Sequence, residues 1–434
     1  MKTTLFTCLL ALCVACAAPR RERLKDVAEK AEVSFFLDES QRKLVDGSNE
    51  FGIRLFQVMA QAHPDSSMVI SPMGVVYSLN MLNNGTDGET LAEICKALGY
   101  GEGDLQRVNE LCRTFLIAQR KQQHIDTEQE LSYMHTVNLL ATIGDDAIKD
   151  AFKDTLAHSY FAKNISETSI TALQQCANQW INEQTEGVVK QIPLHLSADA
   201  PACLVNTIVF RAQWTKSFDA KHTRKVPFYC EDGRVDSVWM MSQYANQETF
   251  RGMHGTSFSA LCLPYSGQFR ITLLLPSKGN TLASLIKCLN VQTLHQINRD
   301  MESFGEFHIR IPRIYLKYSV SLKFLLTQVG IKQAFSHKAN LSKMSGKQLM
   351  LDDVLQQTEL KVDEKETTAV STTTTRFLVK DGDEIATQFH FTADRPFLYY
   401  ISDGFGNVCF IGKYCGPKRL DKRWQATLLH FHYN

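Results

Sequence analysis

Residues 367–379 read Thr-Thr-Ala-Val-Ser-Thr-Thr-Thr-Thr-Arg-Phe-Leu-Val, with no Gly, no Pro and Arg376 as the only charged residue. Most of these residues are β-branched, and their stiff rotamers suit the pleated surface of an extended strand. Acidic and basic residues crowd both flanks, at 361–366 and 380–384. The stretch therefore predicts a long loop between charged flanks that can also form a strand.

Alternate residues of a strand share a face, so this stretch would present two different surfaces. One face carries no charge and stays small until its last residue: Thr367, Ala369, Ser371, Thr373, Thr375 and Phe377. That face could be buried in a sheet without burying a charge. The alternative interpretation is a Thr-rich linker or a glycosylated stalk.

The composition predicts a globular protein with a substantial core. The 434 residues are 44% hydrophobic, and the formal net charge is +1. Such a chain lacks the basic footprint of a nucleic-acid-binding protein, so no nucleic-acid partner is expected. The expected elements are helices first and then mostly strands, without βαβ alternation, which indicates the α+β class. We expect one large folded domain over residues 49–417.

Several segments carry clear signals for secondary structure. The apolar stripe of residues 49–62 predicts a helix. Ser71-Pro72 is typical of a helix start, because Ser caps free amides and Pro suits the first helical position. Residues 170–188 predict another helix, with Gly187 placed to end it. Strands are expected at three places: 204–214, 269–275 and 351–362.

Residues 1–18 resemble an export signal. Lys2 precedes a nearly apolar run, and Ala15-Cys16-Ala17 offers a small-residue cleavage site. The run is shorter than the roughly 20 apolar residues that span a bilayer, so a secreted, extracellular protein is expected. In an alternative interpretation Cys16 is the lipid-bearing cysteine of a bacterial lipoprotein, and only then would the protein be tethered to a membrane. Residues 19–48 predict a charged linker or short helix, and residues 418–434 form a tail.

The cysteines and histidines predict neither a disulfide scaffold nor a metal site. Nine cysteines lie outside the signal, an odd number without any Cys-x-x-Cys pair, so buried free thiols are expected. The histidines within 430–432 could hold a metal, but a frayed tail is the favoured interpretation. The chain contains no nucleophile elbow, phosphate-binding loop or His-Glu-x-x-His motif. We therefore expect no cofactor, no metal and no enzymatic activity.

An ordered set of short motifs resembles those of the serpins, the serine protease inhibitor superfamily. The likeness covers about residues 49–417 and includes Ile70-Ser71-Pro72, Asn178 and Trp180 with Thr185-Glu186-Gly187, Asn206 to Trp214 with Phe218, Leu263-Pro264-Tyr265, Val329-Gly330-Ile331, Asp394-Arg395-Pro396-Phe397, and Phe410-Ile411-Gly412-Lys413. Together and in this order the motifs are specific to that family.

The resemblance implies the serpin fold, with three β-sheets, about nine helices and an exposed reactive-centre loop. It also implies a suicide mechanism in which a protease cleaves the loop and the loop inserts into the main sheet. The protease is then carried away as a covalent acyl complex. About fourteen inserted residues at roughly 3.3 Å each would move it ~46 Å. We expect a monomer that inhibits a serine protease in this way.

Family spacing assigns the reactive bond and the hinge of the loop. The hinge comprises Glu364, Lys365, Glu366, Thr367, Thr368, Ala369, Val370, Ser371 and Thr372. The reactive bond falls between Lys380 and Asp381, and a Lys bait implies a trypsin-like target whose acidic pocket takes Lys or Arg. An alternative bond lies between Arg376 and Phe377. The run Phe377 to Val379 would suit an elastase-like or cysteine protease.

The sequence departs from the family pattern in the hinge and beneath it. Glu366 stands where Gly is usual, and because Gly permits backbone angles that other residues resist, slower insertion is expected. In the shutter and breach, the regions that open for the loop, the resemblance implies roles for Ser71, Asn206, Trp214 and Gln356. Gly74 replaces a usual Ser there, and Gln356 replaces a usual His. We expect Gln356 to hydrogen-bond to Asn206.

Two classes of function remain open at this point. The first is an inhibitor of a trypsin-like serine protease, and the second is a non-inhibitory serpin with a carrier, chaperone or storage role. Non-inhibitory members tend to carry bulky, charged or Pro residues in the inserting segment. Residues 367–375 are small or β-branched, which favours inhibition.

Overall fold

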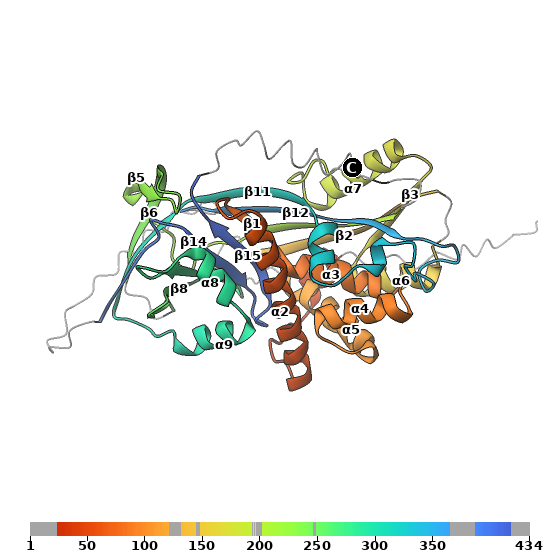
Figure 1. The fold of residues 1–434 in the computed structure, drawn as a ribbon, viewed down its shortest axis with the longest axis horizontal. Helices are drawn as coiled ribbons and strands as arrows, with labels where there is room; N and C mark the ends of the chain where they lie inside the picture. Colours follow the sequence, from red (N-terminus) through yellow and green to blue (C-terminus); the bar gives the residue numbers. More distant parts are fainter. Residues whose placement is uncertain are drawn as a thin grey trace, which may run out of the picture.

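The computed structural model describes residues 24–120, 132–144, 148–192, 194, 196, 202–245, 249–364 and 387–417. These residues form three β-sheets with helices packed around them (Figure 1). Among the helices of the described residues, none is long and apolar enough to cross a membrane. The α+β class expected from the order of elements is confirmed.

Ten α-helices and three short 3-10 helices lie within the described residues. The α-helices are α1 (Leu24–Lys30), α2 (Glu39–Ala62), α3 (Pro72–Asn83), α4 (Gly88–Leu98), α5 (Leu105–Arg120), α6 (Asp150–Tyr160), α7 (Ile170–Gln184), α8 (Leu282–Cys288), α9 (Val291–Asp300) and α10 (Lys323–Gln328). The 3-10 helices are η1 (Glu102–Asp104), η2 (Ala220–His222) and η3 (Gln333–Phe335).

The main sheet has five strands in the order β11-β12-β4-β2-β3: β11 (Ile314–Ser321), β12 (Leu351–Val362), β4 (Ala202–Arg211), β2 (Tyr133–Ile143) and β3 (Lys163–Glu167). A six-stranded sheet has the order β1-β15-β14-β9-β8-β7: β1 (Met68–Ile70), β15 (Val408–Tyr414), β14 (Phe397–Ser402), β9 (Arg270–Pro276), β8 (Phe258–Pro264) and β7 (Arg251–His254). A four-stranded sheet has the order β13-β10-β6-β5: β13 (Gln388–Thr392), β10 (Glu306–Pro312), β6 (Val235–Ala245) and β5 (Arg224–Tyr229).

The main sheet divides the hydrophobic core into two parts, and helices pack against each side of it. On one side α7 buries Leu173, Ala177 and Ile181 against β2 and β3 (Figure 1). On the other side α3 lies between the main sheet and the six-stranded sheet, and all twelve of its residues are buried. Helix α3 begins as expected, because the Ser71 hydroxyl accepts the amide of Gly74 and Pro72 takes the first position.

The boundaries of several elements differ from those expected. Helix α2 begins at Glu39 rather than Asn49, because Asp38 forms a capping box with Gln41. Part of the expected linker 19–48 is therefore helical, including α1, whose Leu24 and Ala28 are buried. Helix α7 ends at Gln184, and Gly187 follows in a turn at φ 83°. Strand β12 has the bounds expected for it.

The nine cysteines outside the expected signal are all free thiols. Seven of them are buried, Cys176 is half-buried and Cys288 is exposed. The absence of a disulfide among the described residues agrees with the odd count and irregular spacing of the cysteines.

Candidate functional site

Strands β4 and β12 form the one parallel pair at the centre of the main sheet. Their register runs from Leu351 beside Ala202 to Glu359 beside Val209, and we call these paired residues the seam. The chain leaves β12 at Val362. A segment that turned back after β12 would run antiparallel to both β12 and β4. The seam is therefore a position where one returning strand could gain a ladder of hydrogen bonds on each side.

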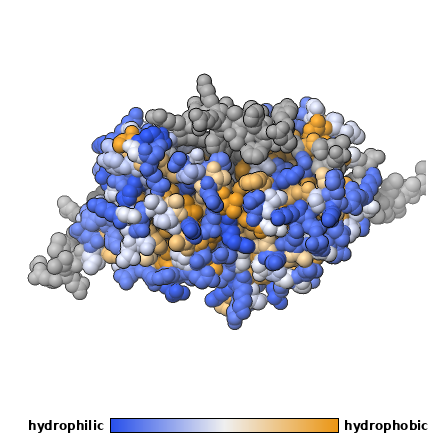
Figure 2. Space-filling model, viewed as in Figure 1, coloured by the Kyte–Doolittle hydropathy of each residue, from blue (hydrophilic) through white to orange (hydrophobic). Residues whose placement is uncertain are grey.

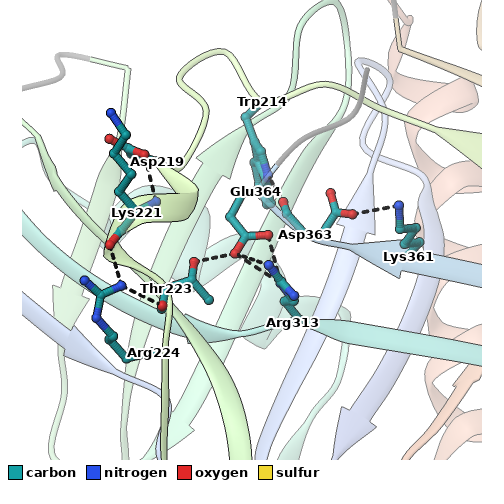
Figure 3. A network of polar contacts seen from close by, with 9 residues as sticks. All are labelled: Trp214, Asp219, Lys221, Thr223, Arg224, Arg313, Lys361, Asp363 and Glu364. Atoms are coloured by element: carbon teal, nitrogen blue, oxygen red, sulfur yellow. Dashed lines mark hydrogen bonds and ion pairs between the residues drawn. The ribbon is translucent and has the colours of Figure 1, made fainter. Parts of the chain in front are cut away.

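The root of the segment that follows β12 is fixed by an ion pair. The Glu364 side chain is only 5% exposed, and Arg313 donates to it from Nε at 2.8 Å and from Nη2 at 2.9 Å (Figure 3). The Thr223 hydroxyl donates to the same carboxylate from the start of β5. Arg313 lies between β10 of the four-stranded sheet and β11 of the main sheet. The ion pair between Arg313 and Glu364 therefore connects the end of β12 to both sheets.

Two opposing effects act on the Glu364 carboxylate. Burial raises its pKa, whereas the hydrogen bonds from Arg313 and Thr223 lower it, and the net pKa lies below the ordinary value. The Arg313 side chain is 42% exposed and keeps contact with water. Glu364 is therefore ionised at neutral pH and is held as a paired anion just after the end of β12.

Trp214 closes the same end of the seam. Its indole Nε1 donates to the carbonyl oxygen of Asp363 at 2.7 Å (Figure 3). The Trp214 ring stacks on Tyr265 with the centroids 4.4 Å apart. Trp214 follows β4, and Asp363 follows β12. Because the β4–β12 ladder ends at Val209 and Glu359, this bond joins the two strands just beyond their last pair.

A row of three polar side chains crosses the middle of the main sheet. Asn138 of β2, Asn206 of β4 and Gln356 of β12 are register partners, and all three are buried. Asn206 donates from Nδ2 to Asn138 Oδ1 at 2.8 Å. Gln356 bonds instead to the backbone of Ser71, accepting its N–H at 2.9 Å and donating to its carbonyl at 2.8 Å.

The expected hydrogen bond between Gln356 and Asn206 is wrong. Asn206 Oδ1 is buried and has no hydrogen-bond partner among the described residues, and it lies 2.1 Å from the position that a Cβ of residue 74 would occupy. Gly74 thus makes room for the Asn206 amide, while the longer Gln356 side chain reaches Ser71. Asn206 and Gln356 each bond to another residue and not to one another, so no hydrogen bond between these two side chains holds β4 to β12.

The structure brings together the sequence-predicted residues in two groups and adds others. Glu364 and Trp214 lie beyond the end of the seam at Glu359 and Val209, whereas Ser71, Asn206 and Gln356 lie at its middle. Sequence reasoning missed three residues: Arg313, Thr223 and Asn138. The only signal for Asn138 was a single amide within an otherwise apolar strand, at 137–141.

Several predicted features lie outside the described residues. These are the hinge residues Lys365 to Thr372, the reactive bond Lys380–Asp381, its alternative Arg376–Phe377, the signal 1–18 with Cys16, and the tail 418–434 with its histidines. Within the part of the chain that is described, no group of three or more His, Cys, Asp or Glu side chains could hold a metal ion.

Comparison with known proteins shows the family. The family description "Serpin (serine protease inhibitor)" matches residues 46–417, and the chain therefore belongs to the serpin family. Serpin B9 of Homo sapiens is 28% identical over 387 residues, which cover 86% of this chain and 99% of that protein. The human plasma serine protease inhibitor is 26% identical over 426 residues, covering 96% and 100% of the two chains.

Solved structures share the fold. Human thyroxine-binding globulin superposes with a TM-score of 0.75 at 22% identity, covering 87% of this chain and 99% of its own. Tengpin, a thermophilic serpin in its native state, gives 0.74 at 21% identity, covering 89% and 96%. The serpin fold expected from the motifs is confirmed. The plasma serine protease inhibitor is a protease inhibitor by its name, whereas thyroxine-binding globulin, by its name, binds a small molecule.

Proposed function

We propose that the protein is a secreted suicide inhibitor of a trypsin-like serine endopeptidase. Membership of the serpin family and the names of the curated relatives support protease inhibition as the class of function. The trypsin-like target, the reactive bond at Lys380 and export through residues 1–18 rest on the sequence.

The geometry of the seam is the observation that carries this proposal. Strand β12 is twelve residues long, and the chain leaves it at one end of the parallel ladder that β12 forms with β4. The residues that follow, 367–375, are small or β-branched and carry no charge. A strand of these residues is about as long as the stretch of β12 that pairs with β4, from Leu351 to Glu359, and could fill the seam.

The mechanism begins with cleavage of the loop. The serine hydroxyl of the protease attacks the Lys380 carbonyl, the bond to Asp381 breaks, and the amine of Asp381 leaves with a proton. Lys380 is then held to the protease as an ester. The parallel ladder of the seam separates, and residues after Glu364 enter as a strand antiparallel to β4 and β12.

The polar row explains why this separation costs little at the centre of the sheet. Because Asn206 stays bonded to Asn138 and Gln356 stays bonded to Ser71, only backbone hydrogen bonds break between Asn206 and Gln356. Each backbone bond is worth about 1 kcal/mol net, and an inserted strand replaces the lost ladder with two. The Trp214–Asp363 hydrogen bond lies just beyond the pair Glu359 and Val209, and it must break before the ladder separates.

A non-inhibitory role is the second candidate, and Glu366 is the observation that favours it. Glu366 falls on the face opposite to Thr367, close to the point where the chain must turn back. A non-Gly residue at this point resists the backbone rotation that insertion requires. If insertion is too slow, the protease deacylates and the serpin is consumed as a substrate.

Mixing the protein with trypsin and running a boiled denaturing gel tests the proposal. The expected result is a band at the summed mass of the protease and the amino-terminal fragment, with cleavage after Lys380. Trypsin whose active-site serine is blocked is the control and should give no such band. Complete cleavage of the loop without this band would overturn the inhibitory proposal and favour the second candidate.

Mass spectrometry of protein expressed with its natural amino terminus tests export. An amino terminus at Ala18 in the medium is expected. A diacylated Cys16 at the membrane would replace the secreted proposal with the lipoprotein alternative.

A further inference from the structure

A cavity of about 880 Å³ lies between α2, α8 and the end of α10, away from the seam and from the root of the loop. We call it the α2–α8 cavity. In Figure 1 α2 and α8 lie together in front of the six-stranded sheet, and Figure 2 shows hydrophobic residues gathered at the centre of the same face. The volume falls within the range of small-molecule sites in proteins.

Lys413 of β15 lines this cavity and is only 1% exposed. Its ammonium group donates to the carbonyl of His63 at 2.6 Å and to that of Ala60 at 3.5 Å, at the carboxyl end of α2. Burial lowers the pKa of Lys413. Carbonyl dipoles at a helix end favour a cation, but they do not replace a counter-ion.

The other cations of the cavity are also without carboxylate partners. Arg54 of α2 donates to the carbonyl of Ala97 at 2.7 Å, and Lys287 of α8 is exposed. Neither of these side chains, nor Lys413, forms an ion pair with any described residue. The one carboxylate that lines the cavity, Glu231, accepts the backbone amide of Leu282 at 2.6 Å. Asp65 also attracts Lys413 electrostatically, so three cations face two carboxylates and an excess of positive charge remains.

The remaining wall is largely apolar. Val58 of α2, Leu282 and Ile286 of α8, and Val329 beyond α10 line it. Leu282 and Ile286 also belong to the buried core, so this wall is anchored in the fold. A ligand that suits the cavity combines an apolar body with a negative charge, because each half then meets a matching surface.

We propose that the α2–α8 cavity binds an amphipathic organic anion, with its carboxylate or sulfonate at Lys287 and Arg54 and its apolar body against α8. Lys413 contributes its charge rather than a hydrogen bond, since the carbonyls at the end of α2 already accept from it. The anion supplies the counter-charge that the described residues do not provide. This proposal is independent of protease inhibition, because it uses no residue of the seam or the loop.

Fluorescence titration with 8-anilinonaphthalene-1-sulfonate tests the site. We expect saturable binding at one site, displaced by decanoate below its micelle concentration but not by decyltrimethylammonium. If decanoate displaces the dye and inorganic sulfate does not, the site takes an anion with an apolar body. If inorganic sulfate displaces the dye equally well, the site takes a simple anion and the proposal is overturned. Equal displacement by the cationic chain would show that charge does not select the ligand and would overturn the proposal.

Two variants and one control, all at exposed positions, test ligand binding without disturbing the folded core. Lys287→Glu should weaken binding at least tenfold, whereas Lys338→Glu makes the same change in net charge at an exposed residue outside the cavity and should not. Ala283→Trp, on the exposed side of α8, should narrow the mouth and also weaken binding. Circular dichroism confirms that each variant is folded. Unchanged affinity in both Lys287→Glu and Ala283→Trp would overturn the proposal.

Discussion

Replacing Arg313 with Met tests what holds the root of the loop. The change removes both charged donors from Glu364 and leaves the Thr223 hydroxyl as the remaining side-chain donor. Met keeps the length of the apolar stem, so the loss is mainly that of the guanidinium. The buried carboxylate then has no cation within ion-pair distance among the described residues.

The magnitude follows from how deeply each partner is buried. Removing one partner of a fully buried pair costs roughly 3–5 kcal/mol. Arg313 is 42% exposed while Glu364 is 5% exposed, so water screens part of the attraction. We expect a loss of about 2 kcal/mol. In a domain of this size each kcal/mol lowers the Tm by about 1–2 °C, so the Tm should fall by about 2–4 °C.

Thermal unfolding at a fixed scan rate measures this loss, and its pH dependence has a definite sign. The pKa of Glu364 in the folded protein lies below its ordinary value of 4.5. Its stabilising contribution is therefore complete above about pH 4.5 and is lost as the pH falls through the folded pKa. The Tm difference between the natural protein and Arg313→Met should be full at pH 7 and shrink below pH 4.5.

A double-mutant cycle with Glu364→Gln isolates the pair from other effects. The coupling between the two positions should be about 2 kcal/mol, and Arg313→Lys should retain part of it because a single ammonium cannot form the fork. A coupling near zero, or a Tm difference that does not change between pH 7 and pH 3, would refute the reasoning.

Three further changes test the loop and the seam. Thr367→Arg puts a charge on the inserting face, so it should abolish inhibition of trypsin while the loop remains cleavable; an unchanged inhibition rate would count against insertion. Lys380→Ala should reduce trypsin inhibition at least tenfold because the bait residue is lost, whereas mass spectrometry that finds cleavage after Arg376 would move the reactive bond. Gly74→Ser places a Cβ 2.1 Å from Asn206 Oδ1 and should destabilise the native protein by about 1–3 kcal/mol, and an unchanged Tm would show that the Asn206 side chain is free to turn away.

Local signals in the sequence were enough for most of the fold. Ser71-Pro72 marked the start of α3, and the alternation over 351–362 gave the bounds of β12. The start of α2 at Glu39 was missed because the charged run before it hid the Asp38 capping box. A helix N-cap depends on only a few neighbouring residues. Where the start of the helix is exposed and rich in charged residues, the capping residues are difficult to recognise among them.

The site was harder to predict because its bonds join residues far apart in the chain. The root of the loop pairs Glu364 with Arg313, and the middle of the seam pairs Gln356 with Ser71. Motifs pointed to Glu364, Gln356 and Ser71, but not to Arg313 and not to the bond between Gln356 and Ser71. The partner of Gln356 depended on the space beside Gly74, which only the packed structure shows.

The heat stability of the protein after cleavage in the loop tests the central claim most directly. A protease that cuts within residues 365–386 but forms no complex would be used, and the Tm of intact and cleaved protein compared. If the loop enters the seam, it adds a strand between β4 and β12. The one extra ladder, of roughly ten backbone hydrogen bonds at about 1 kcal/mol each, should raise the Tm by about 10–20 °C. An unchanged or lower Tm after complete cleavage would contradict insertion.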